Sequence, residues 1–155
     1  MKPQYSIVEY RWSEVKNTVS ETDWQLLAGG FFSAWARNED GTVGFCVFID
    51  LEMKEKLTEE QYKAVLLHEE GHLLYDAEAL KTPSAGLLID VEAEWRADRH
   101  AIESGASAED LYDANLAALE VYFKRKGLKK AMRKAELKAA KERMATYPYY
   151  QGIAH

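Results

Sequence analysis

The chain opens with apolar and polar residues in alternation, and the pattern changes to helical spacing from about residue 58. In the stretch "VEYRW", residues 8–12, every second residue is apolar, which predicts a strand. The stretch "SETDWQLLAGG" that follows predicts a short helix, because Ser20 can cap its first turn and Gly29-Gly30 end it.

Two β-prone runs come next, at residues 31–37 and 43–50. Asp40-Gly41 lies between them and favours a tight turn. The two runs are therefore predicted to pair as a hairpin.

The rest of the chain is predicted to be helical. Thr58 is followed three residues later by Gln61, which is a capping-box signature, so a helix should run from about Glu59 to Tyr75. A connector that contains "KTPSAG" separates it from the next helix. Three more helices are predicted: from Asp90 as N-cap to Gly105, from Ser107 to Gly127, and a very basic one at about 128–145 before the final "TYPYYQGIAH".

Composition fits one folded domain. The chain has 155 residues, of which 47% are hydrophobic and 12% aromatic, enough for a single core. It has no run of roughly 18 apolar residues, its start lacks the apolar centre of a secretory signal, and its single cysteine excludes an internal disulfide. We expect one α+β domain, with a body of residues 1–123 and a basic helical extension of residues 124–155, in a soluble cytoplasmic protein without a membrane partner.

The stretch "AVLLHEEGHLLYDAE", residues 64–78, carries the candidate chemistry. His68 and His72 are four apart in a predicted helix, so their side chains share one face and can bind one zinc ion at ~2.0–2.1 Å. Glu69 can take a proton from a zinc-bound water as this water attacks a carbonyl. The count of H-E-x-x-H expected in a shuffled chain of this composition is roughly 0.01, which argues against coincidence.

A catalytic zinc ion usually has three protein ligands, and a carboxylate is the natural third one here. In "EWRAD", Glu94 and Asp98 are four apart and share a helix face, and Ala97 and Ala101 are small enough for this face to pack closely. We expect Glu94 to bind zinc and Asp98 to accept a hydrogen bond from a ligand histidine. Gly71 likewise leaves room for a neighbouring element. The alternative is that this stretch is a solvated charged helix.

Together, "HEEGH" and the downstream "EWRAD" resemble the gluzincin zinc peptidases with an E-x-x-A-D motif, over roughly residues 43–105. That group contains the prenyl-protein and heat-shock membrane peptidases and the small soluble minigluzincins. The resemblance implies a zincin-like domain in which a sheet with an edge strand packs on the active-site helix. It also implies that His68, His72 and Glu94 are ligands, Glu69 is the general base and Asp98 orients a ligand. The ImmA/IrrE-type peptidases are a second resemblance through the same motif.

Residues 43–50 precede the motif helix directly, so we expect them to be the edge strand to which an extended substrate adds; an ordinary strand is the alternative. The oxyanion-stabilising residue stays open among Tyr75, Tyr112, Tyr122 and Arg96. Three further residues are expected to have structural roles: Cys46 as a buried side chain, His100 as a surface residue, and Trp95 as partly buried packing.

Charge is distributed unevenly. Residues 1–123 hold 10 Lys or Arg and 24 Asp or Glu, a net charge of −14, whereas residues 124–155 hold 10 and 2, a net charge of +8. We expect the basic segment to fold back on the body and its tyrosine-rich end to dock in the active-site cleft. In the minigluzincins such a segment can keep the enzyme latent, so residues 146–155 are a candidate inhibitory segment, in which His155 can approach the zinc ion.

The sequence thus predicts a zinc-dependent metallopeptidase that acts on a peptide or protein substrate. The alternative is a regulatory or scaffold protein with a non-catalytic zinc site that acts through partner binding. Nucleic acid is not an expected partner, because no recognised binding motif accompanies the basic residues.

Overall fold

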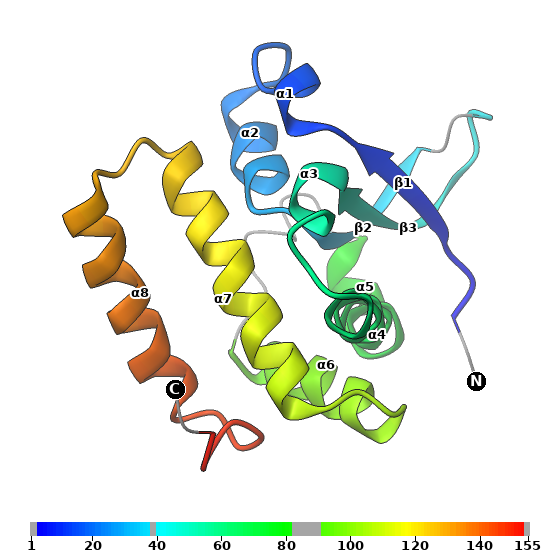
Figure 1. The fold of residues 1–155 in the computed structure, drawn as a ribbon. Helices are drawn as coiled ribbons and strands as arrows, with labels where there is room; N and C mark the ends of the chain where they lie inside the picture. The colour runs from blue at the N-terminus through cyan, green and yellow to red at the C-terminus, as the bar shows by residue number, and fades with distance from the viewer. Residues whose placement is uncertain (1–2, 38–39, 82–90, 154–155) are drawn as a thin grey trace.

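The computed structural model describes residues 3–37, 40–81 and 91–153. Within them the fold is α+β, as predicted: a small three-stranded sheet near the N-terminus is followed by helices (Figure 1). The connector "KTPSAG", the helix N-cap at Asp90 and the terminal His155 lie outside the described residues.

The sheet has three strands, β1 (Ser6–Tyr10), β2 (Phe32–Arg37) and β3 (Val43–Asp50), in the order β1-β3-β2. β2 and β3 pair antiparallel, which confirms the hairpin, and β1 pairs parallel to β3.

The expectation that residues 43–50 form the edge strand is wrong, because β3 lies in the middle of the sheet. The physical reason is its continuous apolar sequence. Cys46, Val47 and Ile49 are fully buried, as in strands that are covered on both faces. Cys46 is thus the buried side chain that was expected. The edge strand that contacts the motif helix is β2.

Two short helices follow β1. The first strand ends at Tyr10, two residues earlier than predicted, and Trp12 instead begins α1 (Trp12–Val15). Trp12 is buried against Trp24 of α2 (Glu21–Ala28), with 5.0 Å between ring centroids. Ser20 caps α2 as expected, since its side chain accepts a hydrogen bond from the backbone of Asp23.

The central helix of the fold is α4 (Glu59–Tyr75), whose predicted capping box between Thr58 and Gln61 is present. One-turn helices precede and follow it, α3 (Leu51–Lys54) and α5 (Ala77–Leu80). The remaining helices are α6 (Val91–Glu103), α7 (Ala108–Arg125) and α8 (Lys130–Met144), close to their predicted limits. Because α7 runs through residue 123, the acidic body and the basic extension share a helix.

α4 lies between two hydrophobic clusters. The sheet-side core contains Val47, Ile49, Leu73 and Leu80. The helix-side core contains Ala64, Ala101, Leu111, Tyr112, Met144 and Tyr150. The C-terminal segment therefore docks on the body, as predicted, and its Tyr150 is one of the buried residues of the helix-side core.

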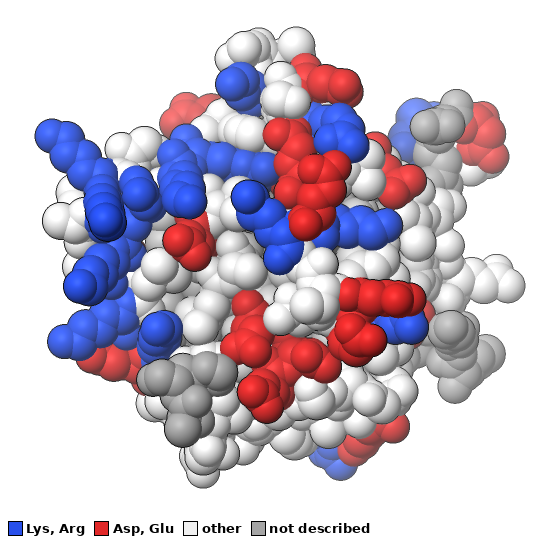
Figure 2. Space-filling model, viewed as in Figure 1, with Lys and Arg blue, Asp and Glu red and all other residues white. Residues whose placement is uncertain are grey.

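α8 packs back along α7, and Lys and Arg side chains gather over α8 on the face shown in Figure 2. In the three described ranges, no helix combines the length and apolar character needed to cross a membrane.

Candidate metal centre

α4 presents both histidines to α6 where the two helices come closest. A Cβ atom added at Gly71 would lie 2.7 Å from the Cα atom of Ala97, so a side chain larger than hydrogen has no room there. Ala97 and Ala101 are fully buried. The expected roles of these small residues are confirmed, and the close approach places Glu94 and Asp98 opposite the histidines.

Three side chains converge at this crossing. The Nε2 atoms of His68 and His72 are 3.1 Å apart, and they lie 3.1 and 3.2 Å from the two carboxylate oxygens of Glu94. Ligand atoms of a tetrahedral zinc site with bonds of ~2.0–2.1 Å are ~3.3 Å apart. The spacing of the two nitrogens and the carboxylate therefore fits a single zinc ion.

Each histidine is oriented by a carboxylate. Nδ1 of His68 lies 2.7 Å from Oδ1 of Asp98, and Nδ1 of His72 lies 3.0 Å from Oδ2 of Asp76. An ionised carboxylate only accepts hydrogen bonds, so both Nδ1 atoms carry the proton and donate it. In the neutral imidazoles, both Nε2 lone pairs then face Glu94 and a common point, which is an arrangement suited to a metal ion.

Asp98 lies where the sequence pattern placed it, whereas Asp76 was missed. Asp76 is four residues after His72 at the end of α4, so the spacing rule that relates the two histidines also relates this pair. Arg96 donates to Asp76 at 3.0 Å and lies beside the centre rather than in it.

The electrostatics of this centre favour a positive charge between these groups. Burial lowers the pKa of His72, but hydrogen bonds to Asp76 and Glu94 outweigh it and raise the pKa to about 9. The pKa of His68 is also well above its usual value, because the opposing effect of burial is exceeded by Glu94 and Asp98. Burial raises the pKa of Glu94, but both histidines more than offset this, so its pKa is lowered. A divalent cation can supply the charge that protons supply here, and two imidazoles with one carboxylate suit zinc.

Glu69 lies next to the ligand set without belonging to it. Its side chain is buried, and burial raises the pKa of this carboxyl. The hydroxyl oxygen of Ser33 on β2 lies 3.0 Å from Oε2 of Glu69 and 2.9 Å from its backbone oxygen, so its single proton is within hydrogen-bond distance of both acceptors. Ser33 was also missed by sequence reasoning, because nothing in the local pattern of β2 relates it to a residue 36 positions away.

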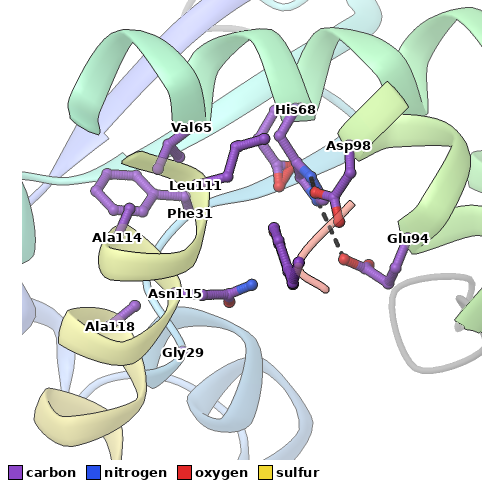
Figure 3. Close-up of a pocket in the computed structure, with 12 residues that line it drawn as sticks. Gly29, Phe31, Val65, His68, Glu94, Asp98, Leu111, Ala114, Asn115 and Ala118 are labelled. Atoms are coloured by element: carbon purple, nitrogen blue, oxygen red, sulfur yellow. Dashed lines mark hydrogen bonds and ion pairs between the residues drawn. The ribbon is translucent and has the colours of Figure 1, made fainter. Parts of the chain in front are cut away.

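A cavity of about 170 Å³ opens beside the centre (Figure 3). Its polar end holds His68, Glu69, Glu94 and Asp98. Its other end is lined by apolar side chains from α4, from α7 and from the residue before β2: Phe31, Val65, Leu111, Ala114 and Ala118. Asn115 of α7 lies between the two ends. Tyr150 of the C-terminal segment also lines this cavity, in line with the expected docking of the tyrosine-rich end beside the site.

None of the four proposed oxyanion-stabilising residues is among the described residues that line the cavity. Tyr75 is 58% exposed, Tyr112 is buried in the helix-side core, and Tyr122 packs on Phe123. Arg96 is held by Asp76.

The expectation that His100 is a surface residue is wrong. Its side chain is only 17% exposed, and its Nε2 lies 3.6 Å from a carboxylate oxygen of Glu70. The reason is that α6 packs closely on α4, so His100 lies beside Glu70 of the motif helix instead of facing solvent. Trp95 is partly buried, as expected, against Tyr147, with 6.1 Å between ring centroids.

Comparison of the chain with protein-family models, with curated proteins and with solved structures found no match.

Proposed function

We propose that this chain is a zinc-dependent metallopeptidase of the gluzincin type, in which His68, His72 and Glu94 bind zinc and Glu69 is the general base. One observation carries the proposal: two oriented imidazoles and a carboxylate converge, 3.1–3.2 Å apart, beside a buried carboxylate outside the ligand set. Three protein ligands are typical of catalytic zinc sites, whereas structural sites usually have four.

A bound zinc ion supplies a Lewis acid that polarises the carbonyl of the peptide bond to be cleaved. The chain's own residues position the reactants and move the proton. Asp98 and Asp76 hold the imidazoles so that both Nε2 atoms face Glu94. Glu69 takes a proton from the attacking water, and its raised pKa brings this carboxyl closer to the neutral range in which a general base is most effective. Ser33 fixes the position of the Glu69 carboxylate.

Two features support an extended peptide as the substrate. Within the described residues β2 pairs only with β3, so its outer side can receive a peptide as an added strand. Ser33 places this strand directly beside Glu69. The apolar end of the cavity, where Ala114 and Ala118 leave space, can then receive an apolar side chain of the peptide.

The test compares the parent protein with Glu69→Gln in metal analysis and in cleavage of an unfolded test protein. We expect one zinc ion per chain in both proteins, because Glu69 is not a ligand. Glutamine cannot accept the proton, so cleavage should fall at least ~10²–10⁴-fold. Glu60→Gln, an exposed position on the same helix, is the matched control and should retain full activity. An active Glu69→Gln protein would refute this mechanism.

A second candidate function is a regulatory or scaffold protein with a non-catalytic zinc site. The observation that favours it is the row of exposed lysines along α8, Lys130, Lys134, Lys138 and Lys141, which recur at helical spacing and can meet an acidic partner. A parent protein that binds zinc but cleaves no unfolded substrate would favour this alternative.

A further inference from the structure

The segment after α8 reaches the metal centre from the far end of the chain. Tyr150 is 2% exposed and belongs to the helix-side core, where its ring centroid is 5.6 Å from that of Tyr112 and 5.7 Å from that of Tyr147. The same residue lines the cavity together with Glu94 and Asp98. Tyr150 is therefore part of the core and part of the cavity wall at once.

The hydroxyl of Tyr150 is buried, and the carboxylate of Asp98 and the amide of Asn115 line the same cavity. In the described part of the chain it has no partner at full hydrogen-bond geometry. A buried hydroxyl without a partner is unfavourable, so a small adjustment that completes a hydrogen bond is favoured. Burial, and then Asp98, raise the pKa of Tyr150, so the group is a neutral donor.

Asp98 is the acceptor to which the Tyr150 hydroxyl can donate a hydrogen bond. Its carboxylate is 3% exposed and accepts a hydrogen bond from Nδ1 of His68 through Oδ1. A carboxylate has two oxygens and about four acceptor positions, so Asp98 can accept a second hydrogen bond. A carboxylate held from two sides has less freedom to turn, and so has the imidazole that it orients.

We propose that Tyr150 is a positioning residue that donates a hydrogen bond to Asp98 and thereby holds His68 in its zinc-binding orientation. The proposal rests on the zinc site of the proposed function. It makes the C-terminal segment a permanent part of the metal centre. A segment that only blocks the cleft would instead have to leave it, and Tyr150 would then have to leave the helix-side core.

The first experiment measures zinc affinity of the full chain by competition with a chelator. Tyr150→Phe removes only the hydroxyl, and we expect it to weaken zinc binding ~10-fold or more, as the loss of an outer hydrogen-bond partner typically does. Tyr112→Phe removes a hydroxyl from the same core at a position that does not line the cavity, and should keep the parental affinity. Thermal unfolding of both variants verifies that they fold.

A double-mutant cycle then separates positioning through Asp98 from a general loss of packing. If Tyr150 acts through Asp98, Tyr150→Phe should have no further effect on zinc affinity in an Asp98→Ala background. Equal effects of Tyr150→Phe in both backgrounds would overturn the proposal, and so would parental zinc affinity in the single variant. Faster cleavage by Tyr150→Phe with unchanged zinc content would also overturn it, in favour of an inhibitory segment.

The readout also separates this proposal from the proposed function. A parent protein that binds zinc without cleaving peptides would refute the peptidase and leave the affinity test of Tyr150 intact. A parent protein that binds no zinc would overturn both.

Discussion

Each histidine of the candidate metal centre is held by a carboxylate from a different part of the chain. His72 is oriented by Asp76, which comes from the end of the same helix, whereas His68 is oriented by Asp98 of α6. Asp98 therefore ties α4 to α6 as well as orienting a ligand. Its loss should affect the metal site without removing any ligand.

We predict that Asp98→Ala keeps the zinc ligands but lowers zinc affinity ~10–100-fold, because the imidazole of His68 loses the acceptor of its Nδ1 proton. Chelator competition measures the change. Glu103→Ala, an exposed position on the same helix that pairs with Arg99, is the control and should bind zinc like the parent. If Asp98→Ala bound zinc as tightly as the parent protein, Asp98 would have no role in orienting His68.

At the residue scale, the sequence revealed what is encoded by spacing within one helix. His68, His72, Glu94 and Asp98 were predicted because positions four apart share a helix face. Asp76 follows the same rule and could have been found. Ser33 could not, because it reaches the site from a strand whose position depends on the whole fold. Docking of the tyrosine-rich C-terminal end was expected, but the sequence did not indicate which of its tyrosines lines the cavity.

At the scale of elements, local signals located the helices but not the order of the strands. Thr58, Ser20 and Ser107 cap their helices as their sequence context indicates, since a cap involves residues only three apart. Which strand lies in the middle depends on pairing between distant segments, here β1 with β3. The apolar run of residues 43–50 carried a usable signal, because strands buried on both faces lack alternation.

The crossing of α4 and α6 depends on Gly71, and we predict that Gly71→Ala destabilises the protein. Alanine favours a helix over glycine by about 0.5–1 kcal/mol, but overpacking a close contact costs ~1–3 kcal/mol, so the clash with Ala97 should dominate. The separation of the helices should also move Glu94 away from the histidines and weaken zinc binding. Chemical denaturation and chelator competition measure the two effects. Unchanged values in both would contradict the close contact between Gly71 and Ala97.

At the scale of the whole molecule, the helix that carries both histidines lies between the sheet-side core and the helix-side core. α4 contributes Leu73 to the first and Ala64 to the second, with the ligand histidines between these residues. The helix-side core includes Tyr150, so the end of the chain contributes to the stability of the body. Whether residues 146–155 also inhibit the site stays a prediction.

Stability and pH are linked through the ligand His72. In the metal-free protein its pKa is about 9, above the ordinary value of 6.5, so protonation of His72 stabilises the folded state. This contribution is fully present below a pH of ~6.5 and is lost as the pH rises through about 9. Zinc takes the place of the proton on Nε2, so the zinc-loaded protein should not show this loss.

We therefore predict that the gap in melting temperature between the zinc-loaded and metal-free proteins widens as the pH rises from about 6.5 to about 9. At the lower pH zinc has to displace the stabilising proton, whereas at the higher pH the metal-free protein has already lost it. Thermal unfolding with one equivalent of zinc or with excess chelator measures the gap, and groups far from the site cancel in the comparison. His72→Ala, the control, should show little gap at either pH. A gap in the parent that stays constant or narrows would contradict the raised pKa of His72.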